Sequence, residues 1–145
     1  MMATYRETVD SVRSPEDTFR FLADLTNFAV WDPGVLAAEQ VAGDGPGPGA
    51  RFDVSVKAWP RPLTLTYDTV EFDAPSTVRV VARSSRLVSD DTITVVPTDD
   101  GCRVTYEANL RLEGWLGPLD PVVGLFFDRI AGRAGDGLRD ELAHS

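Results

Sequence analysis

Histidine and cysteine are almost missing from this chain of 145 residues, which contains one of each, His144 and Cys102. Nucleophilic sites of the Ser-His-Asp and Cys-His types need a histidine beside the nucleophile, and His144 lies next to the C-terminus. Zinc sites built from histidine and cysteine need several such ligands. The sequence therefore excludes both nucleophilic systems, a His/Cys zinc site and an intrachain disulfide.

Basic side chains are also scarce. The 14 Lys and Arg residues face 23 Asp and Glu residues, which gives a formal net charge of -9. Such a charge repels a phosphate backbone, and no basic cluster offsets it. The densest basic pair, Arg83 and Arg86, is expected in a solvated loop at the end of a strand. We therefore expect no nucleic-acid partner.

Long apolar runs are missing as well. The longest run, Val122–Phe127, contains Gly124 and is far shorter than the roughly 18 residues that suggest a membrane span. The N-terminus has no apolar segment of the signal-peptide type. With 43% hydrophobic and 26% charged residues, the composition is typical of a globular domain. We expect a single domain over residues 1–145, no membrane insertion and a cytoplasmic location.

Two polar segments invite a ligand-site interpretation and do not support it. The glycine-rich segment Gly43–Gly49 lacks the Gly-Lys-Ser/Thr ending of a phosphate-binding loop, and its two prolines remove amide donors. Asp99 and Asp100 form an acidic turn without the alternating ligands of a calcium loop. We interpret both segments as turns, and we expect neither a metal nor a cofactor.

The middle of the chain has the pattern of antiparallel strands. Phe52, Val54 and Val56 alternate with polar residues, which is typical of a half-buried strand. Other apolar segments are separated by tight turns at intervals that favour antiparallel pairing over alternating strands and helices. The further strands are expected at Thr4–Val12, Val35–Val41, Leu63–Phe72 and Val78–Ser84 and on both sides of the turn at Thr98–Gly101.

The hairpin of residues 63–84 has two possible registers. One points Tyr67 inward, opposite Ala82. A shift of one residue points Val70 and Phe72 inward instead, beside Val78 and Val80. A bulge near Asp68 would reconcile the two patterns.

The next hairpin has one favoured register. The turn Thr98–Gly101 has strong turn chemistry, and a symmetric register around it pairs Ile93 with Tyr106 on the inner face. The same register places Asp91 opposite Ala108, also facing inward. A bulge at Asp91 would return this carboxylate to solvent, so both placements remain open at this stage.

Two short helices are expected between the first and second strands. Ser14 suits the N-cap of the first, Pro15 suits its first position, and Glu16 suits the positive end of the helix dipole. A second short helical turn leads into Trp31–Gly34, where proline and glycine stop it.

One long amphipathic helix is expected over Gly114–Leu142. Its apolar positions recur at three- and four-residue spacing, at Leu119, Val122, Val123, Phe126, Phe127, Ile130, Ala131, Ala134 and Leu138. The Val122–Ile130 half is expected to line a pocket. The remainder is rich in glycine, which predicts a looser half, and Gly137 on the apolar face is expected to allow close approach to the sheet.

Several short motifs occur in a characteristic order along nearly the whole chain. They are Ser14–Asp17, Trp31–Val35, Val41–Gly47, Asp91–Thr94, Gly101–Tyr106, and Gly114 with Pro118–Pro121. With this order of elements, the chain resembles the SRPBCC superfamily, which includes START-like and polyketide cyclase/dehydrase-like proteins. The resemblance implies an α+β helix-grip fold, in which a seven-stranded antiparallel sheet wraps around a long C-terminal helix and encloses an apolar cavity. Members bind lipids or steroids, cyclise polyketides or assist other proteins, so the fold implies no single activity.

The expected cavity combines apolar and aromatic residues with few polar groups. Tyr106 and Asp91 are the candidates for acid or base chemistry, although no catalytic residue of the family can be matched to a motif in this chain. Trp31 is expected at the rim, where it either caps the cavity or pins the helices to the sheet. Arg129 and Arg133 either reach a polar ligand group or lie in solvent. The expected cavity residues are Phe28, Trp31, Phe52, Val54, Val56, Tyr67, Val80, Ala82, Ile93, Tyr106, Ala108, Leu110, Phe126 and Ile130.

Three functions fit these residues. The first is non-covalent binding of a hydrophobic or amphipathic small molecule, which explains an apolar inner face without a catalytic set. The second is a polyketide cyclase, aromatase or dehydratase that acts in the same cavity without metal or histidine. The third is a protein-interaction module, for which the acidic surface is permissive. The sequence predicts no oligomeric state.

Overall fold

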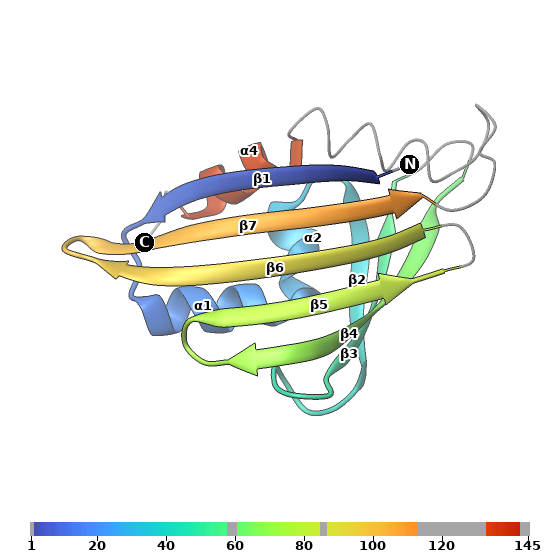
Figure 1. The fold of residues 1–145 in the computed structure, drawn as a ribbon, viewed down its shortest axis with the longest axis horizontal. Coiled ribbons are helices and arrows are strands. Elements are labelled where there is room, and N and C mark those ends of the chain that lie inside the picture. The colour runs from blue at the N-terminus through green and yellow to red at the C-terminus, as the bar shows by residue number, and fades with distance from the viewer. Residues whose placement is uncertain (1, 58–60, 85–86, 113–132, 143–145) are drawn as a thin grey trace.

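Seven strands form one antiparallel sheet in the protein (Figure 1). The structure is a computed structural model that describes residues 2–57, 61–84, 87–112 and 133–142, without the side chains of 2–3 and 133–135. The strand order is β1-β7-β6-β5-β4-β3-β2. The strands are β1 Met2–Ser11, β2 Val35–Ala42, β3 Arg51–Val56, β4 Leu63–Asp73, β5 Thr77–Arg83, β6 Leu87–Thr98 and β7 Gly101–Leu112. The predicted seven-stranded antiparallel sheet is confirmed.

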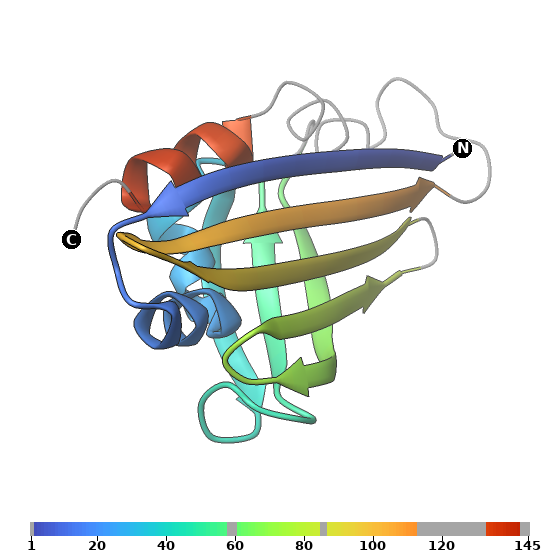
Figure 2. The ribbon, with the colours of Figure 1, turned by 60° about the vertical axis from the view of Figure 1, so that its left-hand side comes forward.

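The described helices lie on the concave side of this sheet. The sheet curves strongly, so that β2 and β3 run across the direction of β1 and β7 (Figure 2). Helix α1 packs against β6 and β7, and α4 packs against β1 and α2. The helical elements are α1 Pro15–Ala23, the 3-10 turn η1 Leu25–Asn27, α2 Phe28–Trp31 and α4 Arg133–Leu142.

The start of α1 follows the prediction. The Ser14 hydroxyl accepts a hydrogen bond from the Asp17 amide at 3.1 Å, and Pro15 occupies the first turn. Phe19 and Leu22 of this helix are buried against the sheet side of the molecule. A capping hydroxyl of this kind contributes about 1 kcal/mol to helix stability.

The β4–β5 hairpin contains the expected bulge, but two residues further along the chain than expected. Tyr67 pairs with Ala82 as in the first predicted register. The register then shifts between Thr69 and Glu71, so that Val70 has no partner in the ladder and its side chain is 54% exposed. The second register is therefore wrong for Val70, which the bulge turns outward. It is confirmed for Phe72, which pairs with Val78 and packs against the core.

The β6–β7 hairpin has the predicted register throughout. Ile93 pairs with Tyr106 and Asp91 pairs with Ala108. The ladder shows no shift at Asp91, whose side chain is completely buried. The alternative in which a bulge returned Asp91 to solvent is therefore wrong.

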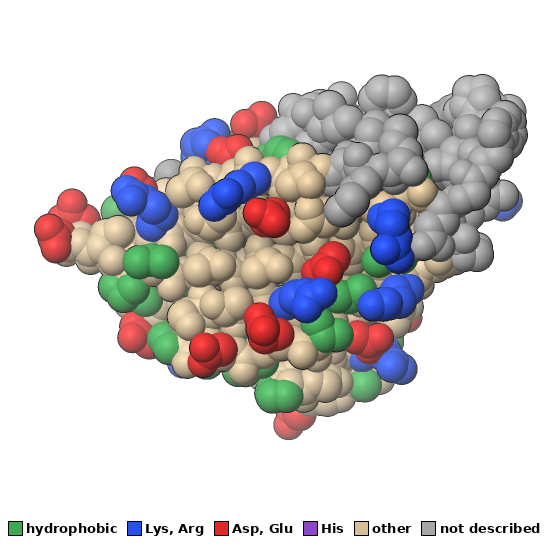
Figure 3. All heavy atoms as spheres, viewed as in Figure 1, with side chains coloured by type: hydrophobic (Ala, Val, Ile, Leu, Met, Phe, Trp, Pro, Cys, Tyr) green, Lys and Arg blue, Asp and Glu red, His purple; other side chains and the backbone are tan. Residues whose placement is uncertain are grey.

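The two faces of the sheet differ in chemistry. Inward-facing residues form one hydrophobic core with the helices, whereas acidic and basic side chains alternate on the convex face (Figure 3). Several of these charges pair across strands, including Arg79 with Asp90 and Arg103 with Asp10. The two-residue period of a strand separates the apolar side chains on the inner face from the charged side chains on the outer face.

The C-terminal helix is described over Arg133–Leu142, and the remainder of the predicted helix, residues 114–132, lies outside the described residues. Leu138 and Leu142 are buried, as expected for an apolar face. Arg139 pairs with Glu7 of β1. Continuity of the helix over Gly114–Leu142 stays a prediction.

Gly137 was expected to approach the sheet closely, and this expectation is wrong about the element that it approaches. Gly137 does approach a backbone closely, but that backbone is the α2–β2 connection: a Cβ at Gly137 would overlap the carbonyl oxygen of Trp31 and lie 2.9 Å from Pro33 Cδ. The glycine therefore serves the packing of α4 against α2, which contact each other in this part of the fold. No helix in the described part of the chain is long and apolar enough to cross a membrane.

Candidate functional site

A buried polar cluster lies on the concave face of the sheet. The Tyr106 hydroxyl donates to Asp91 Oδ2 at 2.7 Å, and the Ser89 hydroxyl donates to Asp91 Oδ1 at 2.7 Å. The Tyr67 hydroxyl lies 3.4 Å from Ser89 Oγ. All four side chains are at most 1% exposed. We call these four residues, Tyr67, Ser89, Asp91 and Tyr106, the inner polar cluster.

The strand order explains how residues far apart in sequence meet here. Ser89 and Asp91 are two residues apart on β6, so both point to the same face. Ala82 of β5 lies between Tyr67 and Ser89 in the sheet, pairing with both. Its methyl group is small enough for the Tyr67 ring to reach across toward Ser89. Ala108, the β7 partner of Asp91, leaves similar room on the other side.

The surroundings of the cluster are apolar, and this makes its hydrogen bonds energetically important. Val80 and Ile93 are buried next to Asp91 in the ladder and on its own strand. A carboxylate removed from water is costly unless hydrogen bonds replace its hydration. Here each carboxylate oxygen accepts from a hydroxyl, which is the pairing that such burial requires.

Aromatic rings of α2 cover the cluster. Trp31 contacts Tyr106 edge to face at a centroid distance of 5.8 Å, and Phe28 lies 6.2 Å from Tyr67. The Phe28 and Trp31 rings themselves are 4.9 Å apart. The short helix therefore holds two adjoining rings over the two tyrosines, and Trp31 is both an aromatic cover and a contact between helix and sheet.

The neighbouring residue Asp90 is also a carboxylate, but it lies on the convex face and has a different partner. Arg79 donates to both of its oxygens, at 2.9 and 2.7 Å. This hydrogen bond holds the pKa of Asp90 below its ordinary value, against a smaller opposing effect of burial. The adjacent carboxylates of β6 therefore point to opposite faces of the sheet. Asp90 pairs with Arg79 on the convex face, and Asp91 accepts from Ser89 and Tyr106 on the concave face.

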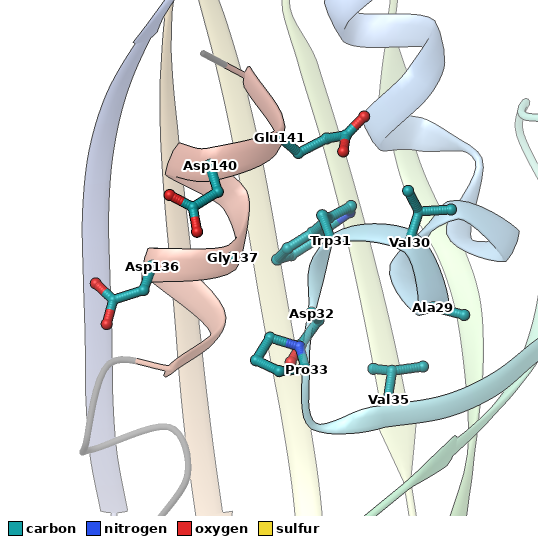
Figure 4. Close-up of a pocket in the computed structure, with 10 residues that line it drawn as sticks. All are labelled: Ala29, Val30, Trp31, Asp32, Pro33, Val35, Asp136, Gly137, Asp140 and Glu141. Carbon is teal, nitrogen blue, oxygen red and sulfur yellow. The ribbon is translucent and has the colours of Figure 1, made fainter. Parts of the chain in front are cut away.

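A cleft of about 690 Å³ opens on the other side of α2, between the α2–β2 connection and α4 (Figure 4). Trp31 and Pro33 face α4 across it, whereas the Asp136 and Asp140 side chains point away from Trp31. Trp31 thus contributes both to the cleft wall and to the cover over Tyr106. The cleft is lined by Ala29, Val30, Trp31, Asp32, Pro33, Val35, Asp136, Gly137, Asp140 and Glu141.

The predicted cavity residues that the structure describes all face the interior, and none is more than 3% exposed. That they contact a ligand stays a prediction. Those described are Phe28, Trp31, Phe52, Val54, Val56, Tyr67, Val80, Ala82, Ile93, Tyr106, Ala108 and Leu110. Phe126, Ile130 and Arg129, together with the Arg133 side chain, lie outside the described residues.

Sequence reasoning missed Ser89 and the cleft. Ser89 shares its face with Asp91 by simple alternation, so the inward placement of Asp91 was the signal that could have found it. The cleft joins Pro33 to Asp136, which are far apart in the sequence, and no local pattern indicates such a contact.

The glycine-rich segment Gly43–Gly49 can also be located. Gln40 donates to the Gly45 carbonyl at 2.9 Å and accepts from the Gly45 amide at 3.0 Å, so the glycine-rich segment is folded onto its own strand as a turn. Within residues 2–57, 61–84, 87–112 and 133–142, no group of three or more His, Cys, Asp or Glu side chains could hold a metal ion.

Residues 2–143 match the family described as polyketide cyclase / dehydrase and lipid transport. The chain belongs to this family. A search of curated proteins found no match.

Solved structures of the same fold extend over nearly the whole chain. The Zhui aromatase/cyclase from Streptomyces sp. R1128 has a TM-score of 0.76 at 13% identity, covering 98% of this chain and 92% of that chain. A START superfamily protein from Mycobacterium smegmatis has a TM-score of 0.69 at 13% identity, covering 97% and 96%. A protein from Thermus thermophilus, TTHA0849, has a TM-score of 0.70 at 18% identity, covering 98% and 97%. At these identities the similarity establishes the fold and not an activity.

Proposed function

We propose that the protein binds a hydrophobic or amphipathic small molecule between the concave face of the sheet and the C-terminal part of the chain. The observation that carries this proposal is the composition of the inner face. Over the described strands it is largely apolar and holds one enclosed polar cluster, in which Asp91 accepts from Tyr106 and Ser89. Such a surface provides apolar contact area and a few oriented polar groups, as small-molecule sites do.

We infer that a ligand reaches this interior past Trp31. Its ring contacts Tyr106 on one side, and the residue lines the cleft on the other. Its backbone is held close to Gly137 of α4. A ligand would therefore enter when the Trp31 side chain rotates, while the backbone of the α2–β2 connection stays in place.

The family description and the similar structures support this proposal at a coarser level. The family includes lipid transport, and one neighbour of the same fold is an aromatase/cyclase. Both descriptions involve molecules with extended apolar surface. Binding of a small apolar molecule is the feature that they share.

The test begins with mass spectrometry of protein purified under native conditions, followed by equilibrium dialysis with 2-methylnaphthalene. We expect a co-purified apolar molecule, or saturable binding of the probe. The Ala82→Leu variant adds bulk on the inner face and should weaken binding, whereas Ala37→Leu on the exposed side of β2 should not. Absence of both a bound molecule and saturable binding would refute the proposal.

A second candidate, a cyclase or dehydratase acting on a polyketide-like substrate, is favoured by one observation. The Tyr106 hydroxyl and the Asp91 carboxylate lie 2.7 Å apart in apolar surroundings, where a proton can be exchanged with a bound substrate. Incubation with a reactive poly-β-keto thioester analogue and analysis of the products by mass spectrometry tests this candidate. Turnover should disappear in Tyr106→Phe while the circular dichroism spectrum is unchanged, and unaltered turnover in that variant would remove Tyr106 from the reaction.

A further inference from the structure

A groove of about 410 Å³ lies beside α1. Three segments form it: α1, the β2–β3 connection at Pro46, and the end of β4 with the turn that follows. These segments adjoin one another in both Figure 1 and Figure 2. Among the described residues, none lines both this groove and the cleft between α2 and α4, and the inner polar cluster does not line it. We call it the α1 groove.

The α1 groove is mainly apolar, and two aromatic rings line it. Phe19 of α1 and Phe72 of β4 contact edge to face at a centroid distance of 5.3 Å. Phe19 is buried and Phe72 is half-buried, while Ala74 and Pro75 of the turn are exposed on the wall of the groove. A ligand with an apolar body would therefore remove apolar surface from water when it covers these residues.

Hydrogen bonds fix the two loops of the groove in place. Gln40 bonds to both the amide and the carbonyl of Gly45, which precedes Pro46. In the β4–β5 turn, the Ser76 amide donates to the Asp73 carbonyl at 2.9 Å. The groove is therefore formed before a ligand arrives, and binding does not have to order these loops.

Two side chains of opposite charge, Glu16 and Arg20, lie about one helical turn apart on the α1 wall of the groove. Arg20 lies 3.9 Å from Asp17, which partly balances its charge. The Glu16 carboxylate has no ion pair or hydrogen bond with any residue that the structure describes. The unbalanced charge of the groove is therefore negative, and the net charge of -9 attracts cations to the molecule as well.

We propose that the α1 groove is a separate binding site for a small molecule with an aromatic body and a positively charged amine. The body lies against Phe19 and Phe72, whose rings also attract a cation, and the ammonium group pairs with Glu16. This inference goes beyond the proposed function, because it assigns a second site and a different ligand chemistry. Since Glu16 is exposed, its charge sets the preference among ligands while apolar contact supplies most of the affinity.

2-Naphthylmethylamine and 2-naphthylacetate test this inference, because they share one ring system and carry opposite charges at neutral pH. Dissociation constants are measured for both by equilibrium dialysis at low ionic strength. We expect saturable binding of the amine, roughly threefold or more tightly than the acid. Added salt should reduce this ratio, since exposed charges are screened. Tighter binding of the acid would show that Arg20 sets the preference, and this would overturn the inference.

Glu16→Lys is the decisive variant, and Glu39→Lys is its matched control. Both replace an exposed glutamate and change the net charge equally, but Glu39 on β2 does not line the groove. Glu16→Lys should reverse the preference, so that 2-naphthylacetate binds more tightly, whereas Glu39→Lys should still prefer the amine. An equal change of the ratio in the two variants would mean that net charge alone sets the preference, and this would overturn the inference.

Ala82→Leu separates the α1 groove from the interior. It adds bulk to the inner face and leaves the groove unchanged, so the amine should bind as in the wild type. If circular dichroism shows that this variant does not fold, Ala108→Val takes its place. Weaker amine binding in this variant and not in Glu16→Lys would place the amine in the interior and overturn the inference. Absence of binding by both probes would also overturn it, and the proposed function would still stand or fall by its own test with 2-methylnaphthalene.

Discussion

Gly137 of α4 and Trp31 at the end of α2 lie in backbone contact, so close that a Cβ on Gly137 would overlap the Trp31 carbonyl oxygen. The contact joins the C-terminal helix to the residue whose ring covers Tyr106. Two polar interactions hold the same helix on β1 and the following loop, since Arg139 pairs with Glu7 and Arg13 pairs with Glu141 at 3.1 Å.

Gly137→Ala should destabilise the protein. In a helix without this contact, alanine would stabilise relative to glycine by about 1 kcal/mol. Here the methyl group must displace the Trp31 backbone, and such overpacking costs about 1–3 kcal/mol. Urea denaturation should show a lower midpoint for this variant. Gly47→Ala, where a Cβ meets nothing within 4 Å, is the control and should change stability little.

Ser89→Ala should destabilise the fold although it removes a single oxygen atom. Asp91 loses one of its hydroxyl donors in a site without access to solvent. Removing one hydrogen-bond donor from a buried carboxylate costs about 1–3 kcal/mol. Ser55→Ala on β3 removes a hydroxyl that contacts Thr64 at the surface, at 3.2 Å, and should have a smaller effect. Equal losses in the two variants, measured by chemical denaturation, would contradict the importance assigned to the cluster.

The ion pair between Arg79 and Asp90 should contribute stability that depends on pH. The hydrogen bond from Arg79 lowers the pKa of Asp90 in the folded protein, whereas the pKa of an aspartate in an unfolded chain is about 3.9. The contribution of the ion pair to the free energy of unfolding is therefore fully present above the pKa of Asp90 in the unfolded chain. It is lost as the pH falls through the lower pKa of Asp90 in the folded protein. Because the pair is partly exposed, we expect less than about 1 kcal/mol at neutral pH.

A double-mutant cycle of Arg79→Gln and Asp90→Asn measures this contribution. The coupling free energy from urea denaturation should be present at neutral pH and should shrink as the pH falls below the unfolded pKa of about 3.9 and then through the lower folded pKa of Asp90. A coupling that stays constant over this range would show that the charge of Asp90 does not stabilise the fold.

The bulge in β4 predicts different responses of two valines to the same substitution. Val70→Thr changes an exposed side chain and should alter stability by less than about 0.5 kcal/mol. Val80→Thr on β5 buries a hydroxyl in apolar surroundings and should cost about 1–3 kcal/mol. Thermal denaturation would reveal the contrast, and a larger loss at Val70 would mean that the register is wrong.

Local chemistry explains why much of the sheet could be predicted. The turn at Thr98–Gly101 has strong sequence preferences, and it fixes every pair of the β6–β7 ladder up to Asp91 and Ala108. The position of the β4 bulge could not be chosen in this way. Val70 is as hydrophobic as Val78 and Val80, which are buried on the partner strand, and only the packed sheet shows that Val70 points outward.

The candidate site was harder to predict because it depends on contacts between distant segments. Asp91 and Tyr106 could be placed on one face from a single hairpin. Tyr67 joins them only through the order of three strands, and Ser89 follows from alternation once Asp91 is known to face inward. The contact between Gly137 and Trp31 depends on the packing of two helices, for which glycine alone indicates close approach and no partner.

Trp31→Phe separates the two roles that Trp31 can have. If the indole ring closes the path from the cleft to Tyr106, a smaller ring should increase both the association and the dissociation rates of 2-methylnaphthalene, with little change in affinity. If Trp31 only pins α2 to the sheet, the variant should lose stability by about 1–3 kcal/mol while the rates stay unchanged. Stopped-flow fluorescence gives the rates and urea denaturation gives the stability. Phe28→Leu, which alters the adjoining ring above Tyr67, is the control, because Phe28 does not line the cleft. Faster exchange in Trp31→Phe and not in Phe28→Leu would assign the gating role to Trp31, and equal rates in both variants would leave it as a packing residue.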